Sequence, residues 1–184
     1  MFNVFTFRRA IGGNAGHFYD TMHERIVYAD KIDENELGHC DGKTPRYIPF
    51  CRLDASRRAK EFIDQEGLPY PDGEPPDPGK LEDLCWDLSR DLVWEWFFYR
   101  DSRFIVETIK WCAENGVEFR YRMGDYNGKG DRWFLPKYEG YIRSSLKELL
   151  KEYQITAPER ARFLQRCIVP ESKDPREVYG LPGA

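Results

Sequence analysis

The three histidines of the chain lie close together near its beginning. His17, His23 and His39 fall within 23 positions of a 184-residue sequence, and Cys40 follows the last of them. Imidazole, thiolate and carboxylate groups are the zinc ligands of proteins, and Asp20 lies in the same segment. These five residues therefore carry a metal hypothesis, with Zn²⁺ or Mn²⁺ as the ion. Because their spacing matches no closed zinc pattern, histidines in a polar surface region are the competing interpretation.

A histidine in such a segment can also act as a general acid or base. The candidate catalytic residues are His17, His23 and Glu24. An ion held in this region, together with a phosphate held by nearby arginines, would make a metal-assisted hydrolase or nuclease. No Ser-His-Asp or Cys-His combination can be assembled from spacing alone, because such partners meet in space.

A glycine-rich segment precedes the histidines. Gly12, Gly13 and Gly16 follow Arg8 and Arg9. Backbone N–H groups at the start of a helix bind anions, and glycine lets the backbone approach them closely. These five residues are the predicted anion- or phosphate-binding site. Their spacing fits neither G-x-G-x-x-G nor G-x-x-x-x-G-K-[ST], so a plain flexible turn is the alternative.

Positive charge gathers in the C-terminal third of the chain. Positions 115–170 hold eleven basic and seven acidic residues, whereas positions 81–99 hold five acids and one arginine. Aromatic residues interleave with the bases, a pattern that suits stacking on single strands and contact with phosphate. The predicted contact residues of segment 117–137, for nucleic acid or for a partner protein, are Arg120, Arg122, Tyr126, Lys129, Arg132 and Trp133. The alternative is a solvated face whose arginines pair with the acidic helix.

Composition limits the class of protein. The net charge of −4 is mild and argues against a strongly basic nucleic-acid binder. An aromatic content of 15% indicates a packed interior, and the length suits one domain. The five cysteines form no C-x-x-C pair, which favours reduced thiols and a cytoplasmic protein. We expect no secretory signal and no membrane-spanning segment.

Hydrophobic patterning predicts the elements of the N-terminal half. A strand is expected at 2–7, a short helix at 17–26 and an edge strand at 46–53. Asp54 is a good N-cap for a helix that Gly67 would end. The proline-rich, acidic segment 67–80 is predicted to be a loop, because proline excludes both a helix and a central strand.

The C-terminal two-thirds is predicted to be mainly helical. Helices are expected at 80–99, from 101 or 102 to 115, around 142–153, and from a capping box at Thr156 to Cys167. Alternation from 117 to 123 predicts a strand that returns as a hairpin over 131–135. Four of the five tryptophans lie between Trp86 and Trp111, and we expect them to form the core.

The sum is an α+β fold in a single domain over 1–184, with a β-hairpin in its helix-rich C-terminal two-thirds. It divides into a region of strand, loop and helix at 1–66, the loop 67–80, a helical core at 81–169 with the hairpin 117–135, and a tail at 170–184. The leading hypothesis is a small intracellular binding or regulatory domain that acts on a protein partner without a cofactor. The alternative is the metal-assisted hydrolase or nuclease.

Overall fold

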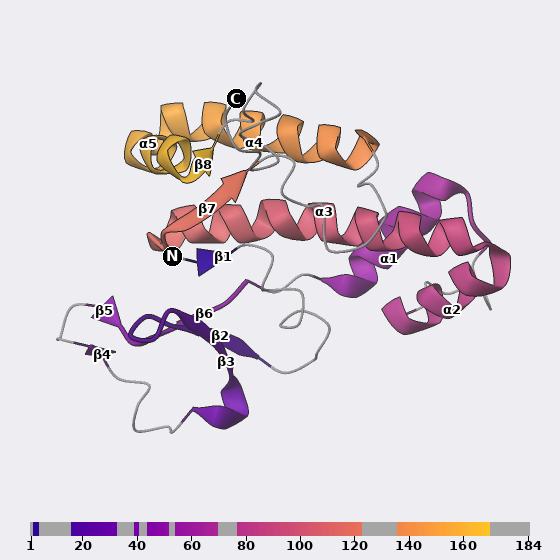
Figure 1. The fold of residues 1–184 in the computed structure, drawn as a ribbon, viewed down its shortest axis with the longest axis horizontal. Coiled ribbons are helices and arrows are strands. Elements are labelled where there is room, and N and C mark those ends of the chain that lie inside the picture. The colour runs from indigo at the N-terminus through magenta and orange to yellow at the C-terminus, as the bar shows by residue number, and fades with distance from the viewer. Residues whose placement is uncertain are drawn as a thin grey trace, which may run out of the picture.

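One long helix, α3 (Arg90–Asn115), runs through the middle of the molecule, and the other elements pack along it (Figure 1). The computed structural model describes residues 2–3, 16–32, 39–40, 44–51, 54–69, 77–122 and 136–169. At 1.5 Å per residue, α3 is about 39 Å long. It begins where the Ser89 hydroxyl accepts the N–H of Asp91 and ends at Gly116, whose φ is 67°.

Two shorter helices cover the N-terminal half of α3. The first, α1 (Ala55–Glu66), begins with the Asp54 side chain accepting the N–H of Arg57 and ends at Gly67, with φ 64°. The second, α2 (Pro78–Leu88), begins in the same way at Asp77. Both boundaries predicted for α1 are confirmed, because each depends on contacts within one helical turn.

Two further helices cover the C-terminal half of α3. Helix α4 (Pro136–Thr156) is joined to α5 (Pro158–Cys167) by Ala157 alone. The predicted helices are present, but the predicted capping box at Thr156 is wrong. Thr156 belongs to α4, and its hydroxyl donates a hydrogen bond to the carbonyl of Glu152. The N-cap of α5 is Ala157, with no side-chain hydrogen bond.

A small parallel sheet lies beside α4 and α5. Strand β7 (Phe119–Arg122) pairs in parallel with β1 (Phe2–Asn3) and with β8 (Ile168–Val169). Parallel neighbours need a long crossover, which α4 and α5 supply between β7 and β8. The predicted strand is therefore present, and both of its described neighbours are parallel. The return strand of the expected hairpin, 131–135, lies outside the described residues.

The N-terminal region forms an antiparallel sheet of order β3-β2-β6. Its strands are β2 (His17–Asp20), β3 (Arg25–Tyr28) and β6 (Tyr47–Pro49). A single turn of 3₁₀ helix, η2 (Ala29–Lys31), follows β3, and β4 (His39–Cys40) pairs with β5 (Thr44–Pro45).

The helix predicted over 17–26 is wrong, because this segment is the β2–β3 hairpin. The Asp20 carboxylate accepts the N–H groups of Met22 and His23, at 3.1 and 3.3 Å, and so closes a turn where a helix would have continued. Side-chain bonds of this kind compete with the helical hydrogen bonds of the backbone.

The core has two parts that share α3. One joins α1, α2 and the first half of α3 around Phe62 and Trp96. The other joins the second half of α3 to α4, α5, β7 and the antiparallel sheet around Ile109 and Trp111. The expectation of a buried tryptophan core holds for Trp96 and Trp111 and fails for Trp86, which is 51% exposed.

The helix break predicted near position 100 is also misplaced. The chain leaves the helical conformation at Ser89, where φ is −168° and ψ is 137°, and α3 then continues through Asp101 and Ser102. Both of these residues are buried in α3. Among the described residues, no helix combines the length and the apolar character needed to cross a membrane.

Candidate functional site

The turn between β2 and β3 brings two members of the predicted histidine cluster, His23 and Asp20, into contact. His23 Nδ1 lies 2.8 Å from Asp20 Oδ2, and the Asp20 side chain is fully buried. Arg46 Nε and Arg25 Nε lie 3.6 and 4.0 Å from the same carboxylate. The turn is further held by Thr21, whose N–H donates to the carbonyl of Arg46 at 2.8 Å.

The electrostatics of Asp20 follow from these contacts. Burial by itself would raise the pKa of Asp20, but the hydrogen bonds from the His23 side chain and from the N–H groups of His23 and Met22 outweigh it. The pKa of Asp20 therefore lies below its ordinary value. A carboxylate that orients a histidine is one part of a catalytic triad. Here the same carboxylate also closes the turn, which accounts for its burial.

His17 and Glu24, the other predicted members whose side chains are described, do not join this pair. His17 lies three residues before Asp20 on β2, so the two side chains leave opposite faces of the strand. The His17 ring packs 4.7 Å from the ring of Tyr28. Glu24 is exposed and adopts a left-handed φ of 49°, which completes the turn.

Metal ligation has no geometric support in the described part of the chain. There, no three His, Cys, Asp or Glu side chains gather as a metal site would require. His39 and Cys40 are described for their backbone alone, in β4. The metal-assisted hydrolase stays a hypothesis drawn from sequence.

Of the five residues predicted to bind an anion, Gly16 is the one that the structure describes. Arg8, Arg9, Gly12 and Gly13 lie outside the described residues. Gly16 precedes β2, and its carbonyl accepts the N–H of Ala29 at 2.9 Å. The expected glycine turn at a helix N-terminus is therefore wrong at Gly16, because the element that follows is a strand.

Most of the predicted basic contact segment also falls outside the described residues, namely Tyr126, Lys129, Arg132 and Trp133. The Arg120 side chain is exposed on β7 between buried Phe119 and Tyr121, which confirms the expected alternation. Arg122 is described for its backbone, which pairs with Val169.

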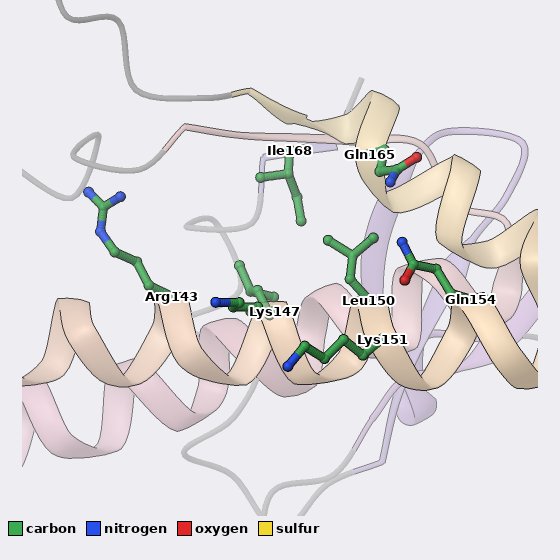
Figure 2. Close-up of a pocket in the computed structure, with 8 residues that line it drawn as sticks. Arg143, Lys147, Leu150, Lys151, Gln154, Gln165 and Ile168 are labelled. Carbon is green, nitrogen blue, oxygen red and sulfur yellow. The ribbon is translucent and has the colours of Figure 1, made fainter.

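The structure adds a site that none of these candidates includes, a groove of about 480 Å³ beside α4 (Figure 2). From here on, "the groove" means the space lined by Arg143, Leu146, Lys147, Leu150, Lys151, Gln154, Gln165 and Ile168. Leu150 points from α4 toward α5 and β8, and Ile168 points back toward α4 (Figure 2).

The pattern of α4 explains why these side chains line the groove. Ile142, Leu146, Leu149 and Tyr153 are buried and belong to the core cluster that α4 shares with α3. Leu150 follows Leu149 and is turned about 100° from it around the helix. It therefore leaves the core face and is half-buried against the last residues of α5 and the first of β8.

Cations border the apolar floor of the groove. Arg143, Lys147 and Lys151 recur every four residues along α4 and so lie along one side of it. Arg143 is paired with Glu139 at 2.6 Å. Lys147 and Lys151 form no ion pair with any described residue. Within the described part of the chain, the groove therefore combines apolar surface with two positive charges that no acidic residue pairs.

The sequence pattern does not reveal the groove, although its cations belong to the basic region 115–170. The available signal was the repeat of Arg143, Lys147 and Lys151 at every fourth position. This repeat does not identify the side of the groove that faces α4, because Ile168, which lies there, is not part of α4.

The described cysteines show no sign of a reactive or cofactor-binding role. Cys51, Cys85, Cys112 and Cys167 are free thiols, and all but Cys51 are buried. Burial raises the pKa of Cys51 to about 12 and that of Cys85 to about 11. A reactive cysteine has the opposite property, a lowered pKa at an accessible position.

Comparison with known proteins gives no direction. No family model matches the chain, no curated protein matches it, and no solved structure matches it. The function of this chain is therefore inferred from the geometry of its described residues.

Proposed function

We propose that this protein is a binding domain whose groove beside α4 takes an acidic, amphipathic helix of a partner protein. The observation that carries the proposal is that half-buried Leu150 and Ile168 lie beside Lys147 and Lys151, two cations that no described acidic residue pairs. An amphipathic helix inserts its apolar side chains into such a groove, and its acidic residues meet the basic rim.

The chemistry of the floor favours protein over nucleic acid as the partner. Leu146, Leu150 and Ile168 supply aliphatic surface, whereas single-stranded nucleic acid is bound by aromatic stacking platforms. The net charge of −4 supports the same choice. A regulatory role and a cytoplasmic location remain predictions from sequence.

The test is a titration with a synthetic acidic helix of about 14 residues, with leucines at i, i+3, i+4 and i+7 and glutamates beside them. We expect binding by fluorescence anisotropy, and weakening as salt rises, because exposed charges are screened over about 10 Å at 0.1 M. The double variant Lys147→Glu and Lys151→Glu should bind about tenfold more weakly, since each exposed ion pair contributes roughly 0.2–1 kcal/mol.

Two variants separate helix insertion from simple charge attraction. Leu150→Ser removes apolar floor and keeps both lysines, so it should weaken the peptide and leave any oligonucleotide binding unchanged. Lys60→Glu reverses an exposed lysine on α1 and is the matched control. Binding of a single-stranded oligonucleotide in place of the peptide would show that the proposal names the wrong partner.

A further inference from the structure

The surface of α2 carries an exposed tryptophan with acidic neighbours. Leu81 and Cys85 bury one side of α2 in the core, while Trp86 lies on the outer side and is 51% exposed. Glu82 and Asp83 come one turn before it, and Asp87 follows it. Trp86 therefore leaves half of its indole in contact with solvent, whereas Trp96 is completely buried.

The acidic neighbours of Trp86 meet no positive charge in the part of the chain that the structure describes. Glu82, Asp83 and Asp87 form no ion pair with any described residue. Helical neighbours three and four positions apart share a face, so Glu82 and Asp83 lie beside the indole. From here on, "the α2 face" means Glu82, Asp83, Trp86 and Asp87. The α2 face is complementary to the groove, because it presents one large apolar side chain among negative charges.

We propose that the α2 face of one copy of the chain docks in the groove of a second copy, and this rests on the proposed function of the groove. Trp86 meets the aliphatic floor at Leu150 and Ile168, and the acids of the α2 face meet Lys147 and Lys151. Aromatic anchors in an apolar pocket dominate the energetics of interfaces, and opposite charges set their orientation.

The two surfaces lie on different parts of the molecule. Helix α2 packs with α1 on the first half of α3, whereas the groove lies between α4, α5 and β8 beside the second half (Figure 1). The contact is therefore head-to-tail, and a pair of copies keeps one free groove on one copy and one free α2 face on the other. Such a contact extends into chains unless the rotation between copies closes a ring. Its small size implies reversible, concentration-dependent association.

The experiment is sedimentation velocity of the full chain over a hundredfold range of concentration. We expect the native protein to associate reversibly beyond a dimer, and to dissociate as salt rises. Trp86→Ala, which removes the anchor, and the double variant Lys147→Glu with Lys151→Glu should each weaken association at least about tenfold. Met22→Ala, which truncates another exposed apolar side chain, is the matched control and should associate like the native chain.

Mixing the two defective proteins gives the sharpest outcome. The Trp86→Ala chain keeps a working groove, and the double-lysine variant keeps a working α2 face, so an equal mixture should form dimers that stop at two copies. Native protein that stays monomeric throughout, a Trp86→Ala chain that associates normally, or a mixture that stays monomeric would each overturn the inference. The helical peptide separates the failures: if it still binds the groove, self-association alone is wrong, and if it does not, the proposed function is wrong as well.

Discussion

Replacing Asp20 by asparagine tests the account of the β2–β3 turn. The carboxylate is fully buried, Oδ1 accepts two backbone N–H groups, and Oδ2 lies 2.8 Å from His23 Nδ1. Asparagine keeps an acceptor for the two N–H groups but replaces Oδ2 by an amide donor without charge. The variant therefore loses one charge-assisted hydrogen bond and its attraction to Arg46.

A hydrogen bond to a charged group contributes about 1.5–3 kcal/mol. We expect Asp20→Asn to lower the free energy of unfolding by about 2 kcal/mol at pH 7. For a chain of this length, that corresponds to a fall in Tm of about 4–8 °C. The measurement is thermal and urea unfolding followed by circular dichroism.

The pH dependence supplies a second readout. Because the pKa of Asp20 is lowered on folding, its contribution is fully present above its unfolded pKa, about 3.9, and is lost as pH falls through its lower folded pKa. The stability difference between native protein and Asp20→Asn should therefore shrink as pH falls below about 4. Asp30→Asn, at a carboxylate on a side chain 72% exposed, is the control and should change stability by less than about 0.5 kcal/mol.

If Asp20→Asn unfolds at the same temperature as the native chain at pH 7, the buried carboxylate does not hold the turn. An equal loss of stability in Asp30→Asn would point instead to the net charge of the chain.

Three further predictions concern stability and thiol reactivity. Gly140→Ala in the interior of α4 should stabilise the protein by about 0.5–1 kcal/mol, because a methyl group there meets nothing within 4 Å. Gly116→Ala should destabilise the protein by about 1 kcal/mol, because the φ of Gly116 is 67°. Urea unfolding measures both changes, and the same sign for both would contradict this prediction. Asp54→Ala should lower the free energy of unfolding by about 1 kcal/mol in the same assay, and Asp54→Asn should lower it much less, because the Asp54 side chain caps α1. Equal decreases for the two variants would show that the cap contributes nothing. Cys85 and Cys112 are fully buried, and burial raises their pKa values. A thiol reagent at pH 7 should therefore modify these two cysteines only after the chain unfolds. Rapid labelling of the folded chain would show that the core opens.

Local signals in the sequence placed the helix ends that depend on neighbouring residues. Asp54 and Gly67 bound α1, and Gly116 ends α3, as predicted. The break at Ser89 was missed because apolar residues recur at helical spacing on both sides of it. Serine and aspartate cap equally well at 89 and at 101, so composition could not choose between the two positions.

Contacts between segments that are distant in sequence decided the fold of the N-terminal region. The hairpin at 17–28 needs β6 beside it, and its pairing competes with the helix that the sequence pattern predicts over 17–26.

Local residue patterns suffice to predict the α+β fold class, the caps of α1 and the apolar positions of α4 and α5, because these follow from residues within one or two turns. Tertiary packing determined that Trp86 is exposed while Trp96 is buried, since burial depends on which neighbour covers each face of a helix. It also decided that Leu150 and Ile168 share a groove. The one-residue link at Ala157 and the parallel pairing of β8 with β7 bring α5 and β8 alongside α4, and no property of either residue alone specifies that contact.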